Sequence, residues 1–250
     1  MNIRRLKRYD TTKNVGCEHP TYKALQMNQQ SRKYQVNRTE TPLETVDANW
    51  NKNFWQEVEA LSVDQVLGDP PAHRPPTRAK IQYDDDAIYV IFQVEDRYVR
   101  AVEKEIHGSI CSDSCVEFFF TPGEDIAAGY FNLEVNAGGV PLLHFQTVPR
   151  QAQLLTEDEV RQIEIKSSQP KIIEPEITEP LTWTLEYRLP LAILEKYLPI
   201  AKPAPGVTWC ANFYKCADAT SHPHWLTWSP VNLPKPDFHV PVDFGLIVFE

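Results

Sequence analysis

The sequence predicts an all-β protein, an antiparallel β-sandwich or jelly-roll with one or two short helices. Short runs of alternating apolar and polar residues recur along most of the chain, separated by residues that form turns. Proline is abundant, with 21 residues, and glycine is scarce, with 9, which suits many short elements joined by stiff loops. Segments with helical periodicity are few. These observations favour a sandwich over a helical or Gly-rich nucleotide-binding fold.

The elements are expected in the following order. Residues 79–83 and 87–94 alternate on either side of Asp84–Asp86, which indicates a β-hairpin. Helices are expected at 156–163, where Thr156 and Glu159 suit a capping box, and at 189–198, where Pro190 suits a first turn. Further strands are predicted at 115–120, 130–136, 140–145, 161–167, 183–190, 207–217 and 244–249, with weaker ones at 33–38 and 58–63.

The 250 residues divide into a polar, basic N-terminal arm, 1–32, and one domain, 33–250. The net charge of −9 disfavours a nucleic-acid partner, because phosphate binding needs a basic face. We find no apolar run long enough to span a membrane. No apolar segment follows the basic start, so we expect a cytoplasmic protein unless the start is misassigned.

Alternation assigns each strand residue to one of two faces. Phe118 and Phe213 are expected in the core, and their neighbours point away. The second face gathers amides, carboxylates, an arginine and aromatic rings: Glu117, Phe119, Tyr130, Asn132, Glu134, Asn136, Thr184, Glu186, Arg188, Cys210, Asn212 and Tyr214. Amides and carboxylates bind hydroxyl groups, and aromatic rings cover the apolar faces of sugars. The pattern therefore indicates sugar binding, and an outer face covered by loops is the alternative.

Other motifs carry less information. The five cysteines, at 17, 111, 115, 210 and 216, have no zinc-binding spacing, so we expect reduced, buried thiols. Trp225 and Trp228 are three apart, which on a strand places them on opposite faces, with at most one facing a ligand. The chain contains no GxSxG, P-loop, GxGxxG or HExxH motif.

Four ordered blocks resemble the family 9 carbohydrate-binding modules, and more closely the family 9-like branch of bacterial polysaccharide-degrading systems. The blocks are YDDDAIYVIFQVEDR (83–97), DSCVEFFFTP (113–122), YFNLEVNAGG (130–139) and WSPV (228–231) with FHVPVDFGLIVF (238–249). The resemblance covers residues 34–250. It implies a β-sandwich that binds sugars without catalysis, in some members the ends of glucans or xylans, and that holds structural calcium.

The resemblance also implies site residues. Glu117 stands where the family has a sugar-binding carboxylate. Glu134 and Asn136 stand where the family has an arginine and an asparagine, so an acid replaces the arginine. The two stacking tryptophans of the family are matched by Ile110 and Cys111 at one position and by Phe238 at the other.

We therefore predict non-catalytic binding of a plant-type polysaccharide or oligosaccharide, such as xylan or glucan ends, for a role in polysaccharide catabolism. The hydrogen-bonding candidates are Glu117, Glu134, Asn136 and Asn212, and the stacking candidates are Tyr214, Trp228 and Phe238. Asp85, Asp96 and Asp113 are candidate calcium ligands, because calcium prefers carboxylate oxygens. Two alternatives stay open. One is a glycoside hydrolase using Glu117 and Glu134. The other is an interaction module with a protein partner that has lost the sugar clamp.

Overall fold

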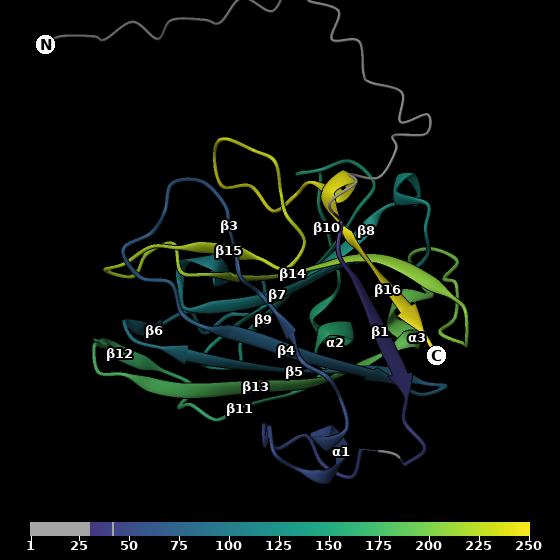
Figure 1. Ribbon diagram of the computed structural model, residues 1–250, viewed down its shortest axis with the longest axis horizontal. Helices are drawn as coiled ribbons and strands as arrows, with labels where there is room; N and C mark the ends of the chain where they lie inside the picture. The colour runs from purple at the N-terminus through teal and green to yellow at the C-terminus, as the bar shows by residue number, and fades with distance from the viewer. Residues whose placement is uncertain (1–30, 42) are drawn as a thin grey trace, which may run out of the picture.

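The computed structural model describes residues 31–41 and 43–250. These residues form two facing sheets (Figure 1). The first sheet has the strand order β10-β9-β8-β7-β14-β16, with β15 and then β3 joined to β14. Its strands are β3 (Gln65–Val66), β7 (Cys115–Thr121), β8 (Tyr130–Asn136), β9 (Pro141–Gln146), β10 (Gln153–Leu154), β14 (Thr208–Cys216), β15 (Trp225–Thr227) and β16 (Gly245–Phe249).

The second sheet has the order β4-β5-β13-β11, with β2 joined to β4. Its strands are β2 (Leu61–Ser62), β4 (Thr77–Tyr83), β5 (Ala87–Asp96), β11 (Glu164–Ser167) and β13 (Leu181–Pro190). Strand β1 (Lys33–Arg38) joins the two sheets, because it pairs with β16 along one part and with β4 along the other. Both pairings are parallel, whereas the other strand pairs among the described residues are antiparallel. A separate ribbon pairs β6 (Val99–Ala101) with β12 (Ile173–Ile177).

The helices are single turns. They are α1 (Asn53–Gln56), α2 (Glu157–Val160) and α3 (Leu191–Leu194), with 3₁₀ turns η1 (Ile110–Ser112), η2 (Ile126–Ala128) and η3 (Pro241–Asp243). The predicted capping box is confirmed, since Thr156 and Glu159 exchange hydrogen bonds at the start of α2. Both predicted helices are shorter than expected. Residues 161–163 form a turn after α2, and β13 continues through Pro190 before α3 begins.

The core between the sheets follows the predicted alternation. Phe118 and Phe213 stack with ring centroids 4.7 Å apart, and Phe92 of the opposite sheet packs against Phe213. The predicted hairpin is also confirmed. Asp84 lies in the turn between β4 and β5, where its carboxylate accepts hydrogen bonds from two backbone N–H groups. Burial of these alternating rows is the main stabilising contribution to a sandwich of this kind.

The predicted second face is divided between two sheets. Glu117 and its neighbours lie on the outer side of the first sheet, whereas Glu186 lies on the outer side of the second. There the Glu186 carboxylate accepts hydrogen bonds from the backbone N–H of Asp47 and Ala48 and from Trp55 Nε1. Alternation distinguishes the faces of one strand but not the sheet to which that strand belongs, so Thr184, Glu186 and Arg188 were wrongly grouped with Glu117.

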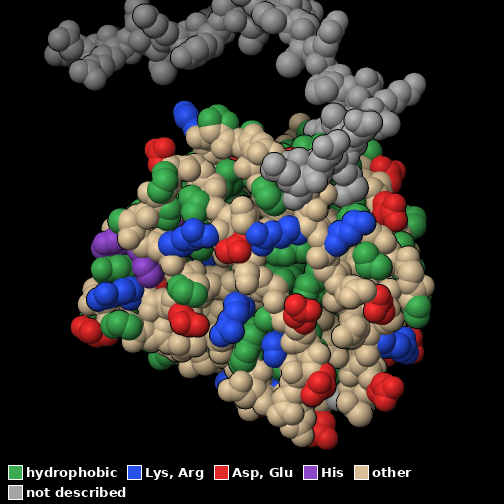
Figure 2. All heavy atoms as spheres, in the orientation of Figure 1, with side chains coloured by type: hydrophobic (Ala, Val, Ile, Leu, Met, Phe, Trp, Pro, Cys, Tyr) green, Lys and Arg blue, Asp and Glu red, His purple; other side chains and the backbone are tan. Residues whose placement is uncertain are grey.

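The predicted arm lies outside the described residues up to residue 30, and β1 begins at Lys33. On the face shown in Figure 2, described basic side chains are interspersed with acidic ones. In the described part of the chain, no helix has the length and apolar character needed to cross a membrane.

Candidate functional site

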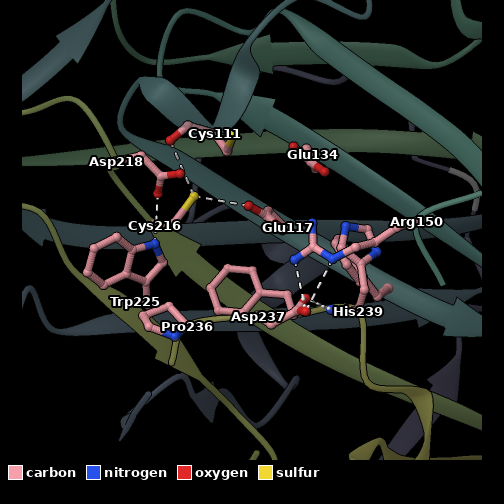
Figure 3. A pocket seen from close by; sticks show the side chains of 12 residues that line it. Cys111, Glu117, Glu134, Arg150, Cys216, Asp218, Trp225, Pro236, Asp237 and His239 are labelled. Carbon is pink, nitrogen blue, oxygen red and sulfur yellow. Dashed lines mark hydrogen bonds and ion pairs between the residues drawn. The ribbon is translucent and has the colours of Figure 1, made fainter. Parts of the chain in front are cut away.

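A cavity of about 160 Å³ lies on the outer side of the first sheet (Figure 3). Strands β7, β8 and β14 supply its floor, and the connections around them supply its walls. Its lining residues are Cys111, Glu117, Phe119, Glu134, Arg150, Cys216, Asp218, Trp225, Pro236, Asp237, Phe238 and His239. A larger hollow of about 1040 Å³ lies beside residues 37–41 and 43–58, and none of the predicted site residues lines it.

Two buried carboxyl groups define the floor. Glu117 on β7 lies directly opposite Glu134 on β8, with exposed fractions of 2% and 7%. Burial, and then the proximity of Glu134, raise the pKa of Glu117 well above its usual range. Burial also raises the pKa of Glu134 to about 7. Near neutral pH the pair therefore holds protons and offers both hydrogen-bond donors and acceptors to a ligand.

Neighbouring side chains orient the two carboxyl groups. The Cys216 thiol donates a hydrogen bond to Glu117 Oε1 at 3.0 Å. Asn132 Nδ2 donates to Glu134 Oε1 at 3.1 Å, and Gln146 Nε2 donates to Asn132 Oδ1 at 2.8 Å. This chain of amides fixes the Glu134 side chain from behind, so the site is preformed on rigid strands.

Aromatic rings form two walls. Phe238 lines the cavity and stacks on Tyr214, with ring centroids 4.1 Å apart and an angle of 18° between the planes. The Tyr214 hydroxyl donates to the Phe238 carbonyl, so Tyr214 supports Phe238 from behind. Half-buried Trp225 forms a second wall, where its Nε1–H donates to Asp218 Oδ1 at 2.8 Å. Because that bond satisfies the polar edge of the indole, its ring faces are left for apolar contact.

The rim is charged. Arg150 and Asp237 form an ion pair at 2.8 Å, as Figure 3 shows beside His239. His239 Nδ1 lies 2.9 Å from the Tyr130 hydroxyl, and burial lowers the pKa of His239 to about 4. This histidine is therefore a neutral hydrogen-bonding group at pH 7.

Three of the predicted ligand-binding residues line the cavity: Glu117, Glu134 and Phe238. Two others, Asn136 and Asn212, are fully buried and lie outside the lining. Asn136 Nδ2 donates a hydrogen bond to Asp113, and Asn136 Oδ1 accepts one from the Val140 N–H. Asn212 Nδ2 donates to the Ser229 carbonyl, and Asn212 Oδ1 accepts from the Ser229 N–H. These amides hold loops to the sheet, and alternation could not reveal that their hydrogen bonds are already used.

The two tryptophans lie on opposite faces, as predicted, but the choice of Trp228 as a stacking platform was wrong. Trp228 is 3% exposed and packs edge-on against Phe213 in the core, with ring centroids 5.9 Å apart. Gly245 makes room for it, since a Cβ there would lie 2.5 Å from the Trp228 ring. Trp225 is the tryptophan that reaches the cavity.

The three candidate calcium ligands do not form one site. Asp85 is paired with Arg38 through both oxygens, and Asp113 accepts from Arg100, from Asn136 and from two backbone N–H groups. The carboxylate of Asp96 is likewise occupied, by hydrogen bonds from His73, Trp183 and the Arg97 N–H and by an ion pair with Lys215. Each carboxylate thus has its own protein partners, and among the described residues the three do not form a group whose ligand atoms lie close enough together for one ion. Calcium binding at other residues stays a prediction of the resemblance.

Several lining residues were not predicted as ligand-binding residues. Arg150, Asp218 and Asp237 lie in connections, which have no alternating pattern to assign them to a face. The positions matched to the two stacking tryptophans of the family did carry a signal. Cys111 and Phe238 both line the cavity, so both matched positions lie at the same hollow although neither is a tryptophan here.

Comparisons with known proteins show the family to which the chain belongs. Residues 50–249 match carbohydrate-binding family 9. A Bacteroides uniformis crystal structure, provisionally described as a carbohydrate-binding protein, is 26% identical, with a TM-score of 0.77 over 88% of this chain and 100% of the other. No curated protein sequence matches this chain significantly.

Two structures of a family 9 module from Caldicellulosiruptor kristjanssonii, one with cellotriose and one with glucose, share the fold. Each is 15% identical with a TM-score of 0.61, over 88% of this chain and 94% or 96% of the module. The family match extends over most of the 250 residues, and it includes every strand that builds the cavity floor. The chain therefore belongs to carbohydrate-binding family 9.

Proposed function

We propose that the cavity binds the terminal sugar of a glucan or xylan chain without catalysis. One observation carries the proposal. Two buried, directly opposed carboxyl groups, Glu117 and Glu134, lie at the floor of a cavity whose walls are the rings of Phe238 and Trp225. Carboxyl groups recognise sugar hydroxyls, and flat aromatic surfaces pack on the C–H faces of the sugar ring.

The solved structures support the choice of ligand class. The C. kristjanssonii module with the same fold was crystallised with cellotriose and with glucose, which share a glucose unit. Here the floor, the two aromatic walls and the charged rim surround a cavity of only about 160 Å³. Such an enclosed space suits one terminal sugar unit better than the middle of a chain.

Isothermal titration calorimetry with glucose, cellotriose and xylotriose tests the proposal. We expect binding by the wild-type chain, and Glu117→Ala should weaken it more than tenfold while the melting temperature stays close to that of the wild type. Glu124→Ala, which removes an exposed glutamate outside the lining, is the matched control and should bind as the wild type does. If Glu117→Ala unfolds the protein, the near-isosteric Glu117→Gln provides the same comparison.

Two results would contradict the proposal. A folded wild-type protein that binds none of the three sugars would show that this cavity has another ligand. Release of glucose from cellotriose, lost in both Glu117→Gln and Glu134→Gln, would show that the carboxyl pair acts as a hydrolase.

A further inference from the structure

Two cysteines and a glutamate meet beneath the cavity. Cys115 on β7 and Cys216 on β14 are directly paired across the two strands, and Glu117 follows Cys115 by two residues on the same face. Both sulfur atoms and a carboxylate oxygen of Glu117 lie within 4.8 Å of one another, and all three side chains are buried. The sugar-binding proposal uses the glutamate but not the thiols.

The spacing of these atoms suits a tetrahedral metal ion. Zinc binds cysteine sulfur at about 2.3 Å and carboxylate oxygen at about 2.1 Å, so neighbouring ligand atoms around it lie roughly 3.6 to 3.8 Å apart. Cys216 Sγ and Glu117 Oε1 are already 3.0 Å apart. Small side-chain shifts would therefore bring the three atoms onto one ion. Thiolate ligands favour zinc over calcium or magnesium, which prefer oxygen alone.

The bonding of Glu117 independently indicates a ligand. A carboxylate can accept about four hydrogen bonds. Among the described residues, the hydrogen-bond donors to Glu117 are the thiols of Cys216 and Cys115, and a thiol is a weak donor. These weak donors leave most of the acceptor capacity of the two Glu117 oxygens unused, and a bound cation would use it.

We propose that Cys115, Cys216 and Glu117 bind a zinc ion whose fourth coordination position opens into the cavity. Cys216 and Glu117 line the cavity, so the fourth position of the ion would face it. Binding forms two Zn–S bonds and one Zn–O bond, and the two thiol protons, with any proton on Glu117, pass to solvent. An open fourth position allows a water or a ligand oxygen to coordinate. The proposal goes beyond sugar binding and does not depend on it.

Cobalt(II) titration of the full-length chain, reduced and freed of metal, tests the site. Cobalt replaces zinc and gives a near-ultraviolet cobalt–thiolate band only when cysteine sulfur binds it. We expect one equivalent of cobalt to produce the band, and zinc to abolish it. Cys216→Ser and Cys115→Ser should each weaken cobalt binding at least tenfold. The melting temperature of each metal-free variant shows whether it is folded.

Cys210→Ser is the matched control. Cys210 is a buried thiol on the same strand and face as Cys216, but it contacts the Glu124 carbonyl and lies outside the three-residue cluster. This variant and Cys17→Ser should keep the band at wild-type affinity. Absence of the band from folded protein with all five thiols reduced would overturn the proposal. Its persistence in folded Cys115→Ser and Cys216→Ser would do the same. Neither result depends on the sugar titrations, so the two proposals fail separately.

Discussion

Glu117 and Glu134 lie directly opposite each other on neighbouring strands, with both carboxyl groups buried at the floor of one cavity. Like charges at directly paired positions destabilise a sheet, and burial of each charge adds to the cost. The pair therefore weakens the fold in its ionised form. Strongly perturbed carboxyl groups of this kind gather at functional sites.

The first prediction concerns pH. The pKa of Glu134 is raised to about 7 by burial, so between its unfolded value near 4.5 and pH 7 the folded state holds more protons than the unfolded state. The stability that this carboxyl group contributes is thus fully present below pH 4.5. It decreases as the pH rises to 7, by about 1.4 kcal/mol for each unit by which the pKa in the folded state exceeds that in the unfolded state. Glu134→Gln should remove this decrease.

The measurement is the difference in unfolding free energy between Glu134→Gln and wild type from pH 4.5 to 7.5. The difference is needed because His144 and His239 act in the opposite direction. Burial lowers their pKa values to about 4, so their contribution increases as the pH rises from 4 to 6.5. A constant difference across this range would contradict the prediction.

The second prediction separates the two tryptophans. Trp225→Ala should weaken sugar binding at least tenfold, about 1.4 kcal/mol, with little change in stability, because Trp225 lines the cavity. Trp228→Phe should do the reverse, costing about 1 to 3 kcal/mol of stability through a cavity in the core without changing sugar affinity. Calorimetry and urea unfolding of both variants check this. Equal loss of sugar affinity in both would refute it.

The third prediction concerns the outer side of the second sheet. Glu186 is fully buried and accepts hydrogen bonds from the backbone of Asp47 and Ala48, from Trp55 and from Lys52. Glu186→Ala leaves these donors unpaired and should cost about 2 to 5 kcal/mol. Sugar affinity of the folded fraction should stay unchanged, since this residue is on the other sheet. If the variant bound sugar more weakly at a temperature where it is folded, the outer sides of the two sheets would not act independently, and the prediction would be wrong.

The fourth prediction concerns a charge between the sheets. Lys215 is fully buried, with Nζ 2.8 Å from His224 Nε2 and 3.6 Å from Asp96 Oδ2. Lys215→Met leaves Asp96 without its buried cation and should cost about 3 to 5 kcal/mol. Adding Asp96→Asn should recover part of that loss. Arg161→Ala, which breaks an exposed ion pair with Glu157, is the control and should cost no more than about 0.5 kcal/mol. If the losses of unfolding free energy in the two single variants simply added in the double variant, Lys215 and Asp96 would not be coupled, and the prediction would be wrong.

The fold was predictable because alternation is a local property. The apolar rows that contain Phe118 and Phe213, the β4–β5 hairpin and the Thr156 capping box depend on residues close together in the sequence. Each of these three features could be predicted from a few neighbouring residues, and each is confirmed. The same pattern placed Glu117 and Glu134 on the face away from the core, which is also their position in the structure.

Tertiary structure alone decided which of the outward-facing side chains meet at the cavity. Whether Glu186 joins Glu117 depends on which sheet β13 enters. Whether Trp225 or Trp228 faces the cavity depends on the register of β15 against β14, which pairs Trp225 with Cys216. Cys115 and Cys216 have no metal-binding spacing in the sequence, yet the antiparallel register of β7 and β14 places them opposite each other. Sequence patterns determine the two faces of a strand, whereas strand pairing between distant segments determines which side chains meet.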